Sequence, residues 1–382
     1  MNEGHSSLLA LELLRRYGMN IDKVKESCIF TTHTPIEAVH DKFPYEIVQE
    51  IMGDFIPIET LKIFGGQDRL NMVRLALNLS NYINGVAKRH RALSRKMFPG
   101  YEINAITNGI HPHTWTCESF RKIYDKYLPG WANEPELLVR VDVIPDEEIW
   151  QGHREAKKVL IDYVNEKTDV DMEYNTLTIG FARRATGYKR ANLIFSDLNK
   201  LRKANRKGKI QIVFAGKAHP KDESGKRIIQ NIYGCIKKLK DEIKIVYLED
   251  YDMELAAKLI PGVDLLLNTP LPPLEASGTS GMKAAQNGVM NFSVMDGWWI
   301  EGCVEGVTGW AIGPYPNDKL TKEYRETKEL DDLYNKLEYV IIPTFYQRRD
   351  DWIKTMKNSI GKLAYYFNSH RMMLRYVTEA YF

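Results

Sequence analysis

Regularly spaced apolar runs in the second half of the chain constrain the fold most. Short runs rich in apolar residues alternate there with stretches long enough to form helices. Runs that are apolar on both faces are typical of strands buried in a parallel sheet. The pattern therefore predicts right-handed βαβ crossovers and an α/β fold with a doubly wound parallel sheet. The predicted strands cover residues 176–181, 210–214, 243–248 and 263–267.

The sheet domain is predicted to span residues 109–366, which makes residues 1–108 a separate N-terminal part. Residues 367–382 are expected to form a C-terminal helix that packs back on that part. Leucine spacing and turn residues suggest both helices and strands in the N-terminal part. The elements expected there are a helix over residues 5–17, a strand over 28–32, a long helical region over 71–96 and a strand over 103–106.

Composition narrows the class of protein. A chain of 382 residues is long enough for two domains. The 53 Lys and Arg residues nearly balance the 50 Asp and Glu residues, so the net charge of +3 does not favour nucleic-acid binding. The four cysteines lack the spacing of a metal site, and no apolar run is long enough to span a bilayer. We therefore expect a cytoplasmic protein with reduced thiols and no metal, which binds neither nucleic acid nor membrane.

A segment of small residues follows the last predicted strand and ends in a lysine. Residues 275–283 read EASGTSGMK and lead into a helical pattern. Small residues let the backbone approach an anion, and the N–H groups and dipole at a helix start favour a phosphate. We interpret the segment as a phosphate cradle that contains Lys283. A flexible loop is the plainer interpretation of the same residues.

A second segment suited to anions follows the first predicted strand. Residues 181–190 read FARRATGYKR, which places four cations within eight residues, and no acidic residue occurs before Ser196. On a solvated helix face, acidic residues would normally be interleaved with such cations. Because ligands of open α/β sheets bind at the carboxyl ends of strands, the two segments together predict a site for two phosphates or one diphosphate.

With these motifs the chain resembles the α-glucan (glycogen/maltodextrin) phosphorylases of the short prokaryotic type. NEGH at 2–5 and TTHT at 31–34 are similar to the acceptor- and sugar-binding segments of that family. The resemblance implies a retaining glycosyltransferase of the two-Rossmann-domain type that uses pyridoxal 5'-phosphate. The motifs that carry the resemblance are EASGT at 275–279, FARR at 181–184, YKR at 188–190, FAGKAHP at 214–220, TNGI at 107–110 and MDGWW at 295–299.

Carried onto this sequence, the resemblance implies roles for individual residues. Lys283 would form a Schiff base with pyridoxal phosphate, Arg184 would contact the substrate phosphate, and Lys189 would lie between the two phosphates. These three are the implied catalytic residues. The residues implied to hold the cofactor's phosphate are Gly278, Thr279, Arg183 and Lys189. The residues implied to bind sugar are His5, His33, Asn108, Tyr188, Glu275 and Ser277.

The reaction implied by the resemblance is reversible phosphorolysis of an α-1,4-glucan to glucose 1-phosphate. In this family the phosphate group of the cofactor, and not its ring, takes part in proton transfer. Inorganic phosphate protonates the glycosidic oxygen and then attacks on the same face of the sugar. The implied partners are glycogen or maltodextrin, inorganic phosphate and a second copy of the chain, because dimers are usual in the family. The reaction requires no metal.

The start of the chain departs from the family pattern. Phosphorylases of this type are longer, and residues 1–106 contain no equivalent of the glycine-rich loop that contacts the substrate phosphate. We therefore expect an incomplete N-terminal domain and a complete C-terminal one. One interpretation is the C-terminal portion of a phosphorylase that needs the missing part for activity, separated from it by a split gene, a misplaced start or a truncation. In a split gene, a separate chain would supply the missing part. A second is a non-catalytic fragment that binds glucan or cofactor.

A third interpretation is a sugar-nucleotide glycosyltransferase of the same fold, in which Arg184 and Lys189 would hold a diphosphate. Lys283 argues against it, because such an enzyme has no use for a lysine behind the glycine segment. Several residues also have a purely structural interpretation. His33 is explained equally by structural hydrogen bonds, and Asn108 by a turn. Of the two adjacent tryptophans at 298–299, we expect one in the core and the other at the rim of the sugar site.

Overall fold

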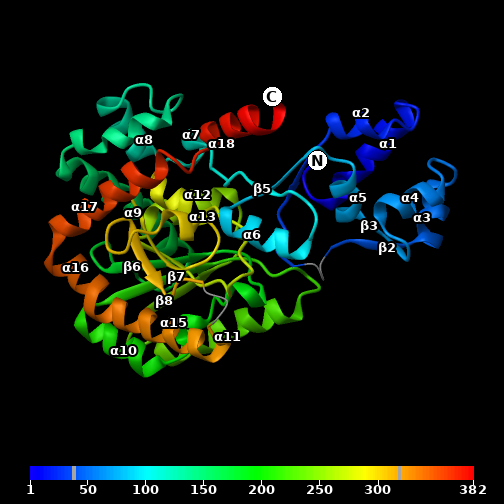
Figure 1. The fold of residues 1–382 in the computed structure, drawn as a ribbon. Coiled ribbons are helices and arrows are strands. Elements are labelled where there is room, and N and C mark those ends of the chain that lie inside the picture. The colour runs from blue at the N-terminus through cyan, green and yellow to red at the C-terminus, as the bar shows by residue number, and fades with distance from the viewer. Residues whose placement is uncertain (37–39, 317–319) are drawn as a thin grey trace. The chain divides into compact units, whose positions relative to one another are not determined.

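The computed structural model describes residues 1–36, 40–316 and 320–382 and separates the chain into two compact units. Unit 1 consists of Met1–Asn108, Pro273–Ser277 and Met372–Phe382, so both chain ends belong to it. Unit 2 consists of Gly109–Pro272 and Gly278–Arg371. In Figure 1 most residues of unit 1 are those at the blue-to-cyan start and the red end of the colour scale, and Pro273–Ser277 fall in its yellow part.

A six-stranded parallel sheet forms the centre of unit 2, with strand order β11-β10-β9-β6-β7-β8. The four predicted strands are all present, with ends within two residues of the prediction, and the α/β fold with a parallel sheet is confirmed. The two strands that the sequence analysis missed, β10 and β11, contain polar residues or glycine. The strands are β6 (Leu177–Ala182), β7 (Ile210–Ala215), β8 (Lys244–Leu248), β9 (Leu265–Asn268), β10 (Met290–Val294) and β11 (Gly309–Ile312).

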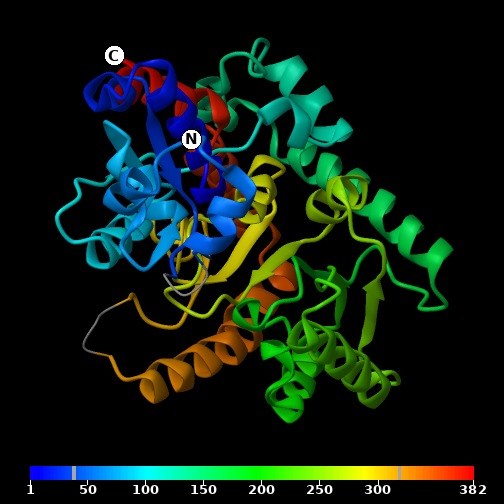
Figure 2. The same cartoon turned by 90° about the vertical axis from the view of Figure 1, so that its right-hand side faces the viewer.

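Helices cover both faces of this sheet. Along β7, Ile212 and Phe214 belong to one hydrophobic cluster, whereas Val213 between them belongs to another. The first cluster includes residues of α15 and the second includes residues of α9, and Figure 2 shows α15 (orange) and α9 (green) on opposite sides of the sheet. Strand β7 is thus buried on both sides, which explains its largely apolar sequence.

The helices of unit 2 precede the first strand of the sheet, connect its strands and continue after the last one. They are α7 (Pro112–Trp115), α8 (Glu118–Tyr127), α9 (Asp146–Lys167), α10 (Leu198–Lys207), α11 (Glu223–Leu239), α12 (Met253–Gly262), α13 (Ser280–Gln286), α14 (Trp299–Gly302), α15 (Lys322–Lys336), α16 (Ile342–Gln347) and α17 (Arg349–Ser359). Short 3-10 turns cover Pro135–Val143, Gly187–Lys189 and Leu193–Phe195, and π-helical turns cover Leu337–Ile341 and Ile360–Ala364.

Unit 1 contains a small parallel sheet of order β1-β4-β5 and an antiparallel pair, β2 and β3. Its first helix follows a 3-10 turn, Gly4–Ser7, for which the side chain of Glu3 supplies the N-terminal cap. The strands are β1 (Ile29–Thr32), β2 (Lys42–Pro44), β3 (Arg69–Asn71), β4 (Tyr82–Gly85) and β5 (Asn104–Ala105). The helices are α1 (Leu8–Arg16), α2 (Ile21–Glu26), α3 (Tyr45–Met52), α4 (Ile58–Gly65), α5 (Met72–Asn78) and α6 (Lys88–Met97).

The long helix predicted over residues 71–96 is wrong. Helix α5 ends at Asn78, strand β4 follows, and α6 begins only at Lys88. Ile83, which falls within the predicted helical region, lies instead in β4 and pairs with Phe30 of β1. The competing interaction is the parallel pairing of β4 with β1, a contact distant in sequence that local periodicity does not reveal.

The last helix, α18 (Ser369–Tyr376), begins in unit 2 and ends in unit 1. A π-helical turn, Val377–Tyr381, continues it. Within unit 1 the hydroxyl of Tyr376 lies 3.1 Å from Thr31 Oγ1 and accepts a hydrogen bond from Asn84 Nδ2 at 3.0 Å. The end of the chain is therefore tied to β1 and β4.

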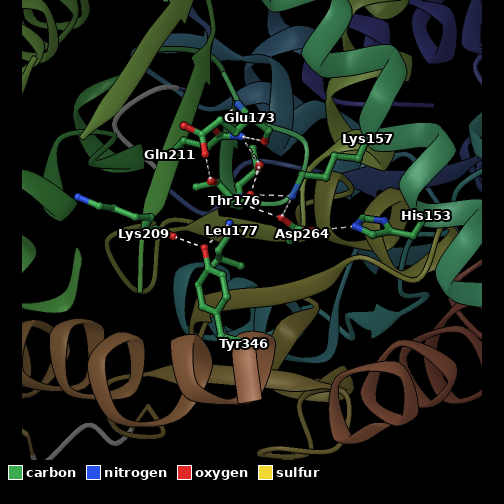
Figure 3. Close-up of polar contacts among 10 residues, drawn as sticks. His153, Lys157, Glu173, Thr176, Leu177, Lys209, Gln211, Asp264 and Tyr346 are labelled. Carbon is green, nitrogen blue, oxygen red and sulfur yellow. Dashed lines mark hydrogen bonds and ion pairs between the residues drawn. The ribbon is translucent and has the colours of Figure 1, made fainter. Parts of the chain in front are cut away.

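A buried ionic network closes the amino end of the large sheet (Figure 3). Asp264, directly before β9, lies 2.5 Å from Lys157 Nζ and 2.8 Å from His153 Nε2, both on α9. It also accepts a hydrogen bond from the backbone N–H of Thr178 on β6 at 2.7 Å. Although burial raises the pKa of Asp264, Lys157 and His153 outweigh burial and hold this pKa below its ordinary value. The side chains of Asp264 and Lys157 are 0% and 3% exposed, so the pair is screened from water.

Further hydrogen bonds extend the network across the same end of the sheet. Gln211 on β7 donates to the carbonyl of Glu173 at 2.8 Å and to Thr178 Oγ1 at 2.9 Å. The hydroxyl of Tyr346 on α16 donates to the carbonyl of Lys209 at 2.6 Å and accepts from the N–H of Leu177 at 3.1 Å. Three neighbouring strands are thereby fixed to helices from both faces (Figure 3).

We expect Asp264→Asn to lower the free energy of unfolding of unit 2 by about 3–5 kcal/mol, because it leaves Lys157 buried without its counter-charge. Tryptophan fluorescence during urea unfolding reports on this unit alone, since all seven tryptophans belong to it. The exposed pair Glu254 and Lys258, at 2.6 Å, provides the control. Glu254→Gln should change the stability by less than about 1 kcal/mol. Equal losses for the two variants would contradict the assignment of a special role to Asp264.

Candidate functional site

Predicted phosphate-binding residues of unit 2 follow the carboxyl ends of its strands. Arg183 comes directly after β6, and its backbone N–H donates to the carbonyl of Ala215 at the end of β7 at 3.1 Å. Its guanidinium donates through Nη1 to Oδ1 of Asn268, the last residue of β9. Asn268 in turn donates to Ser293 Oγ of β10 at 3.2 Å. Arg183 is therefore oriented across this end of the sheet, at the opposite end from Asp264.

Lys283 lies in the short helix α13, which begins within the segment 275–283. Its backbone N–H donates to the carbonyl of Thr279 at 3.1 Å, and its Nζ lies 3.3 Å from the ring centroid of Trp115. Burial lowers the pKa of the Lys283 amine to about 8. A lysine with such a pKa carries a substantial neutral fraction near neutral pH, and only the neutral amine is a nucleophile.

The glycines of this segment are required by the geometry. Gly278 has a φ of +78°, a region that favours glycine. A Cβ atom at Gly281 would lie 2.4 Å from Asn291 Oδ1 and 2.7 Å from the ring of Trp298. Only glycine lets α13 approach β10 this closely. Thr279 occupies the N-cap position of α13, but its hydroxyl makes no capping hydrogen bond to the helix.

The segment around Lys189 is a single 3-10 turn, Gly187–Lys189. Lys189 is buried and its Nζ lies 4.4 Å from the ring centroid of Tyr188. The carbonyl of Tyr188 accepts from the N–H of Leu271 at 2.7 Å, which connects this turn to the chain that follows β9. Arg184, by contrast, is exposed to solvent.

Two of the predicted sugar-binding residues line one cavity of unit 1. His33 and Asn108 contribute to a cavity of about 550 Å³ that is also lined by Asn2 and Tyr376. The imidazole of His33 is hydrogen-bonded through Nε2 to Asn2 Oδ1, and burial lowers its pKa while Glu3 opposes that effect. The structural hydrogen bonds considered for His33 are thus present.

The other predicted sugar-binding residues differ in their surroundings. Glu275 and Ser277 are buried, and the hydroxyl of Ser277 has no hydrogen-bond partner among the described residues. A buried hydroxyl without a partner is costly unless a ligand completes it. His5 is exposed and is not among the residues lining the cavity at His33. Its neighbours Asn2 and Glu3 make the contacts to His33 instead.

The tryptophan pair corrects one prediction. Trp298 and Trp299 are 2% and 0% exposed, so neither forms an exposed rim. They precede and begin the helix α14, where adjacent side chains need not point to opposite faces as they do in a strand, and Trp298 packs against Phe367 with ring centroids 4.8 Å apart.

Asn268 and Trp115 were not among the residues predicted from the sequence. A polar residue at the end of an apolar strand is a signal that could have identified Asn268. No spacing signal connects Trp115 with Lys283, because their contact joins segments far apart in sequence.

The residues of unit 2 fit a phosphate-bearing aldehyde cofactor. The fit rests on the half-buried amine of Lys283, on the turn at Gly278, whose positive φ favours glycine, and on the oriented guanidinium of Arg183. Among the described residues, no group of three or more acidic, histidine or cysteine side chains could hold a metal ion. None of the helices in the described part of the chain has the length and apolar character required to cross a membrane.

Comparisons with known proteins identify a family and several relatives to which the chain is similar. Residues 19–308 match the family described as carbohydrate phosphorylase. The whole chain is 39% identical to a maltodextrin phosphorylase of Thermococcus litoralis and 37% identical to a glycogen phosphorylase of Aquifex aeolicus. It is also 32% identical over its whole length to a glycogen phosphorylase of Mycobacterium tuberculosis. The chain spans 50%, 62% and 50% of the length of these three relatives, respectively.

We expect the amine of Lys283 to react with a small aldehyde at a lower pH than ordinary lysines do. Its neutral fraction rises through a midpoint of about 8, whereas an ordinary lysine titrates near about 10.4. Reductive methylation with isotopic formaldehyde between pH 7 and 10, read by peptide mass spectrometry, measures this difference. The exposed lysines of the same sample serve as the internal control. A profile for Lys283 that coincides with theirs would show that its environment does not depress the pKa.

Proposed function

Because this chain belongs to the carbohydrate phosphorylase family, we propose that it forms the cofactor- and phosphate-binding portion of an α-1,4-glucan phosphorylase. The observation that carries the proposal is the amine of Lys283, which is half-buried and whose pKa burial lowers to about 8. Lys283 is the last residue of the glycine-containing segment 275–283. A lysine in this state is suited to capture an aldehyde.

The proposed cofactor is pyridoxal 5'-phosphate, held covalently by Lys283. When bound, it would supply a phosphate group that exchanges a proton with inorganic phosphate during glycosyl transfer. The chain's own contribution is to hold that phosphate in place. Gly278 allows backbone close to it, the hydroxyl of Thr279 is not used for capping, and Arg183 is oriented at the carboxyl end of the sheet.

Arg184 and Lys189 are the proposed ligands of the substrate phosphate. Two phosphates held close together repel each other, and fixed cations offset that repulsion. The two residues suit different tasks. Buried Lys189 is held by the contacts of its turn, whereas exposed Arg184 is accessible to an anion arriving from solvent.

The N-terminal part supplies the proposed glucan-binding residues. We assign residues 1–108 to the remainder of a glucan-binding domain, residues 109–366 to the cofactor and phosphate domain, and residues 367–382 to a C-terminal helix that returns to the first domain. The cavity lined by His33 and Asn108 supports binding of sugar hydroxyls, since it combines polar groups with an aromatic wall. Tyr188, Glu275 and Ser277 complete the proposed sugar ligands, and His5 belongs to the proposed acceptor-binding segment.

The proposed overall reaction is reversible phosphorolysis of maltodextrin or glycogen. The bond between C1 and the glycosidic oxygen breaks, the oxygen takes a proton from inorganic phosphate, and a phosphate oxygen bonds to C1 on the same face, giving glucose 1-phosphate. Since the chain spans about half of most of the relatives described, we propose this activity for the protein with the rest of the family's length present, in one chain or in two.

Covalent labelling tests the proposal. We expect pyridoxal phosphate followed by borohydride to label Lys283 in the 382-residue chain, and Lys283→Ala to abolish that label. Peptide mass spectrometry locates the label. Lys322→Ala, in the exposed first turn of α15, is the matched control and should leave the labelling of Lys283 unchanged.

The outcomes separate the alternatives. Labelling of Lys283 together with release of glucose 1-phosphate, once the missing length is supplied, supports a phosphorylase. Labelling without release supports a non-catalytic fragment that binds the cofactor. Labelling spread equally over surface lysines would overturn the proposed cofactor site, and saturable binding of a sugar nucleotide in that case would favour the nucleotide-dependent alternative.

A further inference from the structure

Arg190, the one cation of the segment 181–190 to which no role has been assigned, joins two parts of unit 2. Its Nε donates to the carbonyl of Thr269 at 3.0 Å, and its Nη2 donates to the carbonyl of Pro270 at 2.7 Å. In the opposite direction, Thr269 Oγ1 lies 3.1 Å from the carbonyl of Lys189 and 3.0 Å from that of Arg190. We call residues 188–190 together with residues 269–271 the clasp.

The third nitrogen of the guanidinium, Nη1, forms an ion pair with an acidic side chain. Arg190 Nη1 lies 2.6 Å from Glu329 Oε2 on α15, and the two side chains are 15% and 1% exposed. The planar fork of arginine thus serves two carbonyls and a carboxylate at once, which a lysine amine cannot do with the same geometry.

Two features of the backbone show that the positions of Arg190 and Glu329 are fixed by the residues around them. Arg190 has a φ of 46° and a ψ of 47°, a left-handed conformation that is unfavourable for a residue other than glycine. Gly313, with a φ of +75°, leaves the space for Glu329, because a Cβ atom there would lie 2.5 Å from Glu329 Cγ. The strain at Arg190 persists because the contacts of the clasp over-determine its position.

The clasp joins the end of the predicted phosphate-binding segment 181–190 to residues 269–271, which come shortly before the second segment, 275–283. Lys189, the proposed phosphate ligand, is bonded to Arg190 in the chain, and residues 269–271 follow directly on β9 and lead toward the glycine segment. We propose that Arg190, anchored by Glu329, is a positioning residue that holds Lys189 and the chain after β9 in fixed relation, so that the phosphate-binding cations are placed before a ligand arrives. This inference rests on the proposed function.

A purely structural role predicts something different. If Arg190 only stabilised unit 2, its replacement would weaken every ligand of the site to the same extent. A positioning role is specific, because it concerns the cations that face a phosphate. Pyridoxal phosphate and pyridoxal share the aldehyde that reacts with an amine, but only the former carries a phosphate, so the ratio of their affinities isolates the effect.

The test compares Arg190→Lys with Arg325→Lys. Both variants keep the positive charge near Glu329, but Arg325 Nε lies 3.9 Å from the carboxylate, and the hydrogen bonds of the clasp do not include it. We expect Arg190→Lys to weaken binding of pyridoxal phosphate about tenfold while changing pyridoxal affinity less than about twofold. The variant loses the hydrogen bonds from the guanidinium of Arg190 to the carbonyls of Thr269 and Pro270. The cations they position would contact a phosphate, which pyridoxal lacks. Arg325→Lys should leave both affinities unchanged.

A second measurement keeps the inference independent of ligand binding. Hydrogen exchange of the Leu271 N–H, which donates to the carbonyl of Tyr188 at 2.7 Å, reports directly on the clasp. Exchange at Leu271 should accelerate about tenfold or more in Arg190→Lys and in Glu329→Gln, and remain unchanged in Arg325→Lys. The thermal unfolding midpoint of each variant identifies general destabilisation.

The outcomes distinguish the two proposals. No label on Lys283 in the unaltered chain overturns the proposed function, and the exchange at Leu271 then decides whether the clasp exists. Normal labelling with equal losses of pyridoxal phosphate and pyridoxal affinity in Arg190→Lys overturns the positioning role alone. Unchanged affinities with unchanged exchange at Leu271 overturn it as well.

Discussion

The buried carboxylate of Asp264 is the interaction on which the arrangement of unit 2 depends. It accepts hydrogen bonds from α9 and from β6 while itself preceding β9, so one side chain fixes a helix and the two central strands of the sheet. A charge in this place is tolerable only because Lys157 and His153 surround it. Directional bonds of this kind set the register of elements that hydrophobic packing alone would allow to slide.

The two ends of the sheet have different physical characters. At the amino end, Gln211 and Tyr346 satisfy the backbone with short hydrogen bonds within the unit. At the carboxyl end, Arg183 and Lys189 belong to a segment that contains no acidic residue. The guanidinium of Arg183 is oriented there by a hydrogen bond to Asn268. The buried carboxylate of Asp264 and the segment that carries these cations thus lie at opposite ends of the sheet.

The sequence predicted four of the six strands of unit 2 because these are largely apolar, as in residues 210–214. It also showed that the cation segment 181–190 and the glycine-containing segment 275–283 come after two of these strands. It could not predict β4, whose pairing with β1 competes with a locally helical pattern. Nor could it predict the contact of Trp115 with Lys283, which depends on tertiary structure alone. The two tryptophans at 298–299 were misjudged because the prediction assumed a strand where a helix begins.

The order of the strands also has a consequence for how the chain folds as it is made. Strands β6, β7 and β8 are consecutive in sequence and adjacent in the sheet, whereas β9 returns to pair with the free edge of β6. Until β9 and the preceding Asp264 are synthesised, 107 residues after Lys157, that edge of β6 has no partner strand and the lysine of α9 lacks its counter-charge. Assembly of the second half is therefore a late, long-range event, and an exposed strand edge during this interval favours misassociation of nascent chains.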